Sequence, residues 1–230
     1  MEQISMTTER LIIDRIRESD REDYFTNVSH DREVLKTFIC RYAETLDEFD
    51  FAPYLTNPNL FAIRKKEDRR LIGIILYFDE KEGQCEVGYG IGSSHWNQGY
   101  TTEALRAFLQ FLFETKGFEK VYASYFPGND ASRRVMEKCG MRYSHTNKKE
   151  LNYLEEERDL IYYMIERNEY KKGESTMEEQ IVKITIKTKG EECQMNDAEI
   201  KAWYKEKIAG LFNPVYGTPE IKVELERKKK

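Results

Sequence analysis

The stretch that decides the fold runs from residue 86 to residue 105 and reads EVGYGIGSSHWNQGYTTEAL. Its first six residues read as a strand, and a short loop containing Gly99 then opens a helix. Backbone N–H groups at a helix start have no partner within the helix and lie at the positive end of its dipole. They form a site for an anion such as a pyrophosphate, to which Thr101 and Thr102 can add hydroxyl donors. Since one glycine before a helix is usually plain turn chemistry, this loop alone does not decide the function.

A second stretch carries the remaining signal. Residues 127–141 read PGNDASRRVMEKCGM and follow a run at 120–125 that is rich in β-branched and aromatic residues and predicts a strand. A short helix is predicted over 131–139. Gly140 ends it at the position where a left-handed residue commonly stops a helix.

The two stretches together resemble motifs of the Gcn5-related N-acetyltransferase (GNAT) superfamily, in the branch that includes the ribosomal-protein alanine acetyltransferases. That branch typically reads Trp-Gly-x-Gly-Tyr-Ala-Thr-Glu-Ala in the first motif and Asn-x-x-Ser-x-x-Val-Met-Glu-Lys-x-Gly-Phe in the second. The matching residues are Trp96, Gly99, Tyr100, Thr102, Glu103 and Ala104, then Asn129, Ser132, Val135, Met136, Glu137, Lys138 and Gly140. The opening Thr8-Glu9-Arg10-Leu11 fits as well, and the resemblance covers about residues 7–167.

Three positions depart from the branch pattern. Asn97 stands where glycine is common, Thr101 where alanine or glycine is usual, and Met141 where phenylalanine is usual. The first two are small and polar, and the third is a soft apolar exchange. The predicted phosphate-binding loop is therefore retained.

The resemblance implies an α+β fold, with a GNAT-type mixed, mostly antiparallel twisted sheet flanked by helices. It also implies acetyl-coenzyme A as co-substrate and no metal. The pyrophosphate is expected on the loop and the pantetheine arm beside the strand at 86–91, where that strand splays from the next. The residues expected to bind the coenzyme are Ile91, Trp96, Gln98, Gly99, Tyr100, Thr101, Thr102 and Asn129.

The family reacts by direct attack of a neutral amine on the thioester, and this chemistry suggests three catalytic candidates. Glu86, or water held by it, is the candidate base; alternatively it pairs with a basic neighbour or faces solvent. Ser132 matches the serine proposed in this branch to donate a proton or a hydrogen bond to the departing thiolate. The alternative is that it only bonds to the preceding turn of its helix. Tyr125 is a reserve candidate for that role. A backbone N–H near Ile91 is expected to stabilise the oxyanion.

The remaining regular structure is predicted from residue patterns. Strands are predicted at 11–16, 60–63, 71–78, 86–91 and 159–165, and helices at 21–51, broken near its middle and ended by Pro53, and at 102–115. Ser19 or Asp20 is the expected cap of the first helix. Four aromatic residues of that region are interpreted as core rather than substrate contacts: Tyr42, Phe49, Phe51 and Tyr54.

Composition changes after residue 168. The chain is predicted to consist of an acetyltransferase domain at 1–170, a polar linker at 171–180 and a small β-α-β domain at 181–230. The last segment is too short to form a stable core alone. We therefore expect it to pack on the main domain, to dock a partner or to form the interface of a homodimer.

Charge and cysteine usage restrict the class of partner. A net charge of −5 weighs against nucleic acid and suits a cationic amine. No apolar run reaches the length of a membrane span, and no signal peptide is seen, which predicts a cytoplasmic protein without a membrane partner. The four cysteines and three histidines are scattered, which predicts reduced thiols and no metal site.

The predicted function is transfer of an acetyl group from acetyl-coenzyme A to a primary amine. A protein N-terminal amine and a small-molecule amine both stay open, because the branch contains enzymes for each. The alternative is a non-catalytic module that holds acetyl-coenzyme A as a sensor or scaffold.

Overall fold

The computed structural model describes residues 4–153, 156–170, 198 and 202. The chain divides into two compact units, Met1–Glu169 and Tyr170–Lys230. The second unit lies almost entirely outside the described residues. The predicted linker at 171–180 and the predicted domain at 181–230 both fall there, and they stay predictions.

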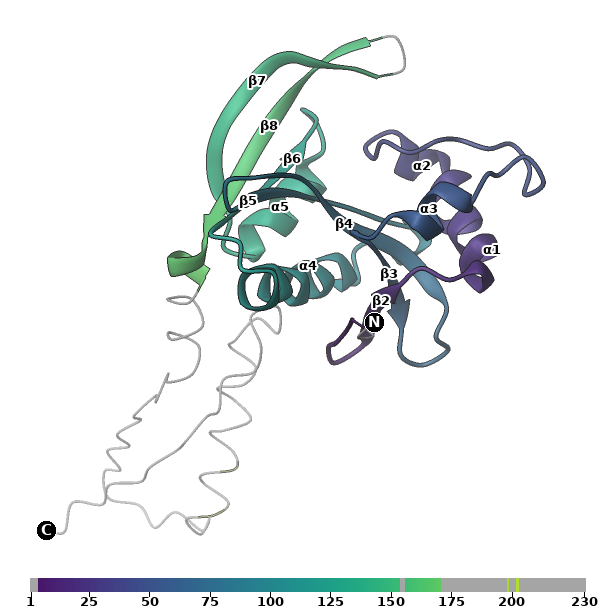
Figure 1. The fold of residues 1–230 in the computed structure, drawn as a ribbon, viewed down its shortest axis with the longest axis horizontal. Helices are drawn as coiled ribbons and strands as arrows, with labels where there is room; N and C mark the ends of the chain where they lie inside the picture. Colours follow the sequence, from purple (N-terminus) through teal and green to yellow (C-terminus); the bar gives the residue numbers. More distant parts are fainter. Residues whose placement is uncertain (1–3, 154–155, 171–197, 199–201, 203–230) are drawn as a thin grey trace, which may run out of the picture. The chain divides into compact units, whose positions relative to one another are not determined.

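Eight strands form one sheet in the order β1-β2-β3-β4-β5-β6-β8-β7 (Figure 1). Their bounds are β1 Ser5–Thr7, β2 Leu11–Arg15, β3 Leu60–Lys65, β4 Leu71–Lys81, β5 Gln84–Ile91, β6 Lys120–Tyr125, β7 Arg142–Tyr153 and β8 Glu156–Glu166. Neighbours pair antiparallel except β5 and β6, which run parallel. The predicted mixed, mostly antiparallel sheet is confirmed.

The helices of the first unit are short except for one. They are α1 Arg21–Tyr24, α2 Arg32–Leu35, α3 Ala52–Thr56, α4 Tyr100–Gln110 and α5 Asp130–Lys138. Figure 1 shows α4 and α5 together beneath the sheet, whereas α1, α2 and α3 group near the strands that open the chain. No helix in the described part of the chain combines the length and apolarity needed to cross a membrane.

The two faces of β5 meet different layers. The side chain of Tyr89 reaches Ser132 of α5, whereas a Cβ on the next residue, Gly90, would lie 3.1 Å from the ring of Phe38, which follows α2. Side chains alternate between faces along a strand. Val87, Tyr89 and Ile91 therefore face the α5 side, and Glu86 faces the opposite side.

The predicted helix over 21–51 is wrong in its second half. Helical structure there comprises α1, a π turn at Phe25–Ser29 and α2, while residues 36–51 form turns and irregular chain. Pro53 lies in the first turn of a short helix, α3, instead of ending a long one. A proline fits the first turn of a helix, where its missing N–H has no helical acceptor to reach.

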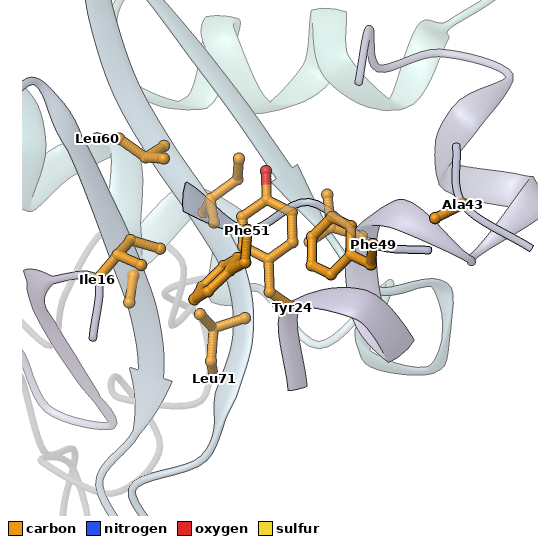
Figure 2. Close-up of a cluster of buried hydrophobic side chains, with 10 residues drawn as sticks. Ile16, Tyr24, Ala43, Phe49, Phe51, Leu60 and Leu71 are labelled. Carbon is orange, nitrogen blue, oxygen red and sulfur yellow. The ribbon is translucent and has the colours of Figure 1, made fainter. Parts of the chain in front are cut away.

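Aromatic packing explains why that segment is not helical. Phe49 and Phe51 are both 3% exposed and contact the buried ring of Tyr24, with centroids 5.6 and 5.5 Å apart (Figure 2). Burying two side chains only two residues apart against one ring suits extended chain, because such residues lie on different faces of a helix. The core interpretation is confirmed for these two rings. Tyr54 is partly buried beside them, and Tyr42 is 38% exposed.

Asp20 does not cap the first helix with its side chain. Its carboxylate accepts bonds from Arg17 N, in the 3-10 turn before α1, and from the guanidinium of Arg64, which also binds Asp14 at 2.7 Å. Asp14, Asp20 and Arg64 are each 3% exposed. A buried charge needs a partner of opposite sign, and this requirement outweighs the local cap that the sequence suggests.

The sequence also left two strands unassigned. β1 precedes the predicted first strand, and β7, with the polar sequence RYSHTNKKELNY, pairs with β8 at the edge of the sheet. The described side chains of β7 from residue 142 to 149 are exposed or half-buried. A strand with no buried face lacks the alternation by which strands are recognised in sequence.

Candidate active site

A gap opens between the two parallel strands. β5 and β6 pair only from Gln84↔Lys120 to Glu86↔Tyr122, although β5 continues to Ile91 and β6 to Tyr125. The splay expected at this point is present.

Backbone donors of β5 face this gap. The N–H of Gly92 donates to Ile72 O of β4 at 3.0 Å. In an antiparallel pair, the backbone groups of alternate residues point to the same side. The N–H groups of Tyr89 and Ile91 therefore point away from β4, into the gap, where a ligand can receive them.

Trp96 closes one end of the gap. Its indole Nε1 donates to the carbonyl oxygen of Ile91 at 2.7 Å, and the side chain remains 41% exposed. The carbonyl of Ile91 is therefore satisfied within the chain, while its N–H remains a donor toward the gap. This contact gives the predicted site residue Trp96 a positioning role at the end of β5.

The predicted phosphate loop leads into α4, which begins at Tyr100, two residues earlier than expected. Gly99 is the N-cap and adopts a left-handed φ of 81°. The first helical bond runs from Glu103 N to Gly99 O at 3.1 Å. Within the described residues, the N–H groups of Tyr100, Thr101 and Thr102 have no hydrogen-bond acceptor. Three unpaired donors at the positive end of an 11-residue helix are suited to hold an anion.

The first strands of the chain hold this loop through one carboxylate. Glu103 accepts bonds from Thr8 Oγ1 at 2.5 Å and from Arg10 N and Nε at 2.8 and 2.7 Å. Arg10 also donates to Gln98 O at 2.9 Å and lies over the ring of Tyr100. Burial by itself would raise the pKa of Glu103, but these hydrogen bonds and the guanidinium charge lower it. The opening motif and the phosphate loop are thus one structure.

Asn129 caps α5. Its Oδ1 accepts a bond from Ser132 N at 3.1 Å, which fixes the first turn of the helix. The side-chain nitrogen takes no part in this cap, so Asn129 keeps a donor for a ligand. Its predicted role toward the coenzyme is compatible with this geometry but stays a prediction.

Ser132 lies beside the gap on the α5 face of the sheet. Its Oγ is 2.9 Å from the phenolic oxygen of Tyr89. The hydroxyl thus contacts a neighbouring strand, in contrast to the alternative in which it bonds only to the preceding turn. Sequence reasoning missed Tyr89, although the stretch GYG at 88–90 places one large side chain between two glycines beside the predicted gap.

Tyr125 lies on the same face and is buried. Its ring meets that of Tyr163 edge-on, with centroids 5.9 Å apart, and burial raises its pKa. The hydroxyl that the structure brings to Ser132 is that of Tyr89. The reserve role of Tyr125 therefore gains no support from this geometry.

Glu86 faces the other side of the sheet. Its Oε1 accepts a hydrogen bond from Ser124 Oγ of β6 at 2.5 Å. The carboxylate lines an open cleft of about 390 Å³. The other residues around this cleft are Asp79, Lys81, Glu82, Gln84, Cys85, Tyr122, His145, Asn147 and Tyr162.

The cleft is acidic and partly aromatic. Asp79, Glu82 and Glu86 contribute carboxylates, against Lys81 as the one lysine or arginine among its lining residues. His145 and Tyr162 stack with centroids 4.6 Å apart. This lining suits a cationic group. In the described part of the chain, no group of three His, Cys, Asp or Glu side chains could hold a metal ion.

Comparison with known proteins agrees with this geometry. Residues 10–142 match the family described as Acetyltransferase (GNAT) domain, and the chain belongs to this family. The uncharacterised protein YkkB of Bacillus subtilis is 44% identical over 77 residues, which span 34% of this chain and 45% of YkkB. The chain thus spans less than half the length of that relative.

Two further comparisons cover more of the molecule. The [ribosomal protein uS5]-alanine N-acetyltransferase of Escherichia coli is 22% identical over 157 residues, covering 60% of this chain and 77% of that protein. The crystal structure of a GNAT-family acetyltransferase from Bacillus anthracis superposes with a TM-score of 0.65 at 27% identity, covering 72% of this chain and 99% of that one. The predicted superfamily and the acetyltransferase class are confirmed, and a ribosomal-protein alanine acetyltransferase is among the relatives, as the predicted branch implies.

Proposed function

We propose that this protein transfers an acetyl group from acetyl-coenzyme A to a primary amine, either a protein N-terminus or a small-molecule amine. One observation carries the proposal. At the gap between β5 and β6, the hydroxyl of Ser132 lies on one face of the sheet and the carboxylate of Glu86 lies on the other. The unpaired N–H groups at the start of α4 lie a short loop beyond the end of β5.

These residues suit acetyl-coenzyme A. The N–H groups of Tyr100, Thr101 and Thr102 have no acceptor among the described residues, and the left-handed Gly99 leaves room for a phosphate close to the backbone. Thr101 is half-exposed whereas Thr102 is buried, so of the two hydroxyls Thr101 is the more accessible donor. When bound, the coenzyme supplies an acetyl group on a thioester.

Different groups of the chain act in the separate steps of the transfer. Glu86, directly or through water, takes a proton from the ammonium form of the acceptor, whose ordinary pKa is near 8 for an α-amine and near 10 for a lysine-like amine. The N–H of Ile91 stabilises negative charge on the carbonyl oxygen. The new N–C bond forms as the C–S bond breaks, and the electron pair leaves with sulfur, beside Ser132.

The acceptor is proposed from the cleft beside Glu86. Three carboxylates and the stacked rings of His145 and Tyr162 favour an amine that arrives as a cation. The Escherichia coli relative is named as an alanine N-acetyltransferase of ribosomal protein uS5, and this name supports a protein amine such as an N-terminus as the first acceptor to try. A cytoplasmic location and a homodimer stay predictions.

Calorimetry with acetyl-coenzyme A, followed by thiol release with a panel of amines and N-terminal peptides, tests the proposal. Binding with turnover supports an enzyme, whereas binding without turnover on every acceptor favours the sensor or scaffold. Glu86→Gln should lower kcat by about 100-fold with little change in coenzyme affinity, because only proton removal is lost. Glu80→Gln is the control, since Glu80 is an exposed carboxylate of neighbouring β4 that binds Asn59 at 2.9 Å. Equal activities of the two variants would exclude Glu86 as the base.

A further inference from the structure

Tyr89 and Ser132 form a hydrogen-bonded pair beside the gap. The two hydroxyl oxygens are 2.9 Å apart, and the phenolic oxygen is also 3.4 Å from the carbonyl oxygen of Ser132. The backbone of Ser132 is fixed separately, because its N–H donates to Asn129 Oδ1. The position of the serine therefore depends on the Asn129 cap, while the direction of its hydroxyl proton depends on Tyr89.

A serine hydroxyl carries one proton and can accept two hydrogen bonds. If Tyr89 donates to Ser132 Oγ, the serine proton is left to point elsewhere. If Tyr89 donates to the carbonyl instead, the serine proton is used on the phenol. The distances favour the first arrangement, because O–H···O bonds are commonly 2.7–2.8 Å and 3.4 Å exceeds their usual range.

We propose that Tyr89 is a positioning residue, which donates to Ser132 Oγ and so directs the Ser132 proton toward the sulfur that leaves during acetyl transfer. This inference rests on the proposed function and adds a residue to it.

The pair stabilises the leaving group without giving up a proton. As the amine nitrogen bonds to the carbonyl carbon, the C–S bond breaks and sulfur departs with the electron pair. The excess proton left on nitrogen passes to water, because Glu86 already holds the proton that it took from the ammonium form. Burial raises the pKa of Tyr89 well above its ordinary value, with the bond to Ser132 acting in the opposite direction. A relay that left Tyr89 as a phenolate would be unfavourable, so Ser132 donates a hydrogen bond to the thiolate and keeps its proton.

A double-mutant cycle tests this inference with Tyr89→Phe, Ser132→Ala and the combined variant. Tyr89→Phe should lower kcat about tenfold and leave the KM for acetyl-coenzyme A within about twofold, because one transition-state hydrogen bond of about 1.4 kcal/mol is weakened. Adding Tyr89→Phe to Ser132→Ala should cause no further loss, since Tyr89 acts only through the serine. The control is Tyr163→Phe, which removes a buried hydroxyl bonded to Glu137 on the same helix at 3.1 Å and should keep full activity.

The outcomes separate this inference from the proposed function. Wild-type protein that turns over no amine would overturn both. Wild-type turnover with multiplicative losses in the combined variant, or with an unaffected Tyr89→Phe variant, would overturn the inference alone. If phenylalanine at this position impairs folding, 3-fluorotyrosine at residue 89 keeps the ring and the donor. It should retain kcat within about twofold, and a tenfold loss would contradict the role of the hydrogen bond.

Discussion

Replacing Arg10 by methionine should weaken acetyl-coenzyme A binding without slowing the chemical step. The guanidinium donates to Gln98 O at 2.9 Å and to Glu103 Oε2 at 2.7 Å, and it lies 4.5 Å from the centre of the Tyr100 ring. Methionine retains most of the aliphatic stem and removes these three contacts. The phosphate loop would lose the guanidinium contacts that tie it to the turn before β2, while Thr8 Oγ1 and the backbone N–H of residue 10 would still bind Glu103. Binding would then have to order the loop more fully.

The magnitude follows from the exposure of the contacts. The Arg10 side chain is 43% exposed, so its ion pair with Glu103 contributes only about 0.2–1 kcal/mol. The bond to Gln98 O adds about 1 kcal/mol and the ring contact about 0.5–1 kcal/mol. Part of this sum stabilises the fold rather than the loop. We therefore expect the free energy of acetyl-coenzyme A binding to weaken by about 1.4 kcal/mol, which is a tenfold increase in Kd.

Calorimetric Kd values and steady-state kinetics measure this effect. The matched control is Arg70→Met, because Arg70 forms a similar ion pair with Asp23, at 2.5 Å and 65% exposed, at the end of the β3–β4 turn. Arg10→Met should raise Kd and KM for acetyl-coenzyme A about tenfold and change kcat less than threefold. An unchanged Kd, or the same increase in Arg70→Met, would refute the tether.

Two further predictions concern stability. Asp31 caps α2 and accepts a bond from Ser93 N at 2.7 Å; burial alone would raise its pKa, but these backbone hydrogen bonds lower it. Asp31→Ala should therefore cost about 1–2 kcal/mol of unfolding free energy at pH 7, a difference that shrinks as the pH falls below about 4 and the wild-type carboxylate is protonated. Urea titrations across pH check it, and a difference that grew in acid would contradict the sign. Arg64→Met should cost about 3–5 kcal/mol, because Asp14 and Asp20 stay buried without that guanidinium; a loss below 1 kcal/mol in thermal or urea unfolding would show that water reaches them.

Local signals account for the elements that were predicted well. The strand at Lys120–Tyr125 was predicted with its observed bounds, because it is rich in β-branched and aromatic residues. The helix α5 was predicted within one residue at each end, and Gly140 follows it with a φ of 80°. In these segments each residue's preference agrees with its place in the fold.

Segments governed by distant partners were predicted poorly. The region 36–51 contains helix-compatible residues, yet Phe49 and Phe51 pack on Tyr24 in irregular chain. Asp20 has a typical capping side chain, yet it binds Arg64, 44 residues away. In both cases tertiary packing outweighs local preference, and no pattern within a short window records the partner.

The sequence by itself determined the family, because the family motifs are residue types at short, fixed spacings, and it also predicted the phosphate-binding loop and the candidate residues Glu86 and Ser132. Only the tertiary structure decided what joins them. The sheet sets Glu86 and Ser132 on opposite faces, and it brings Arg10 to Glu103 and Tyr89 to Ser132. The physical reason is that these contacts link residues 43 to 93 positions apart, and sheet order and register fix such distances.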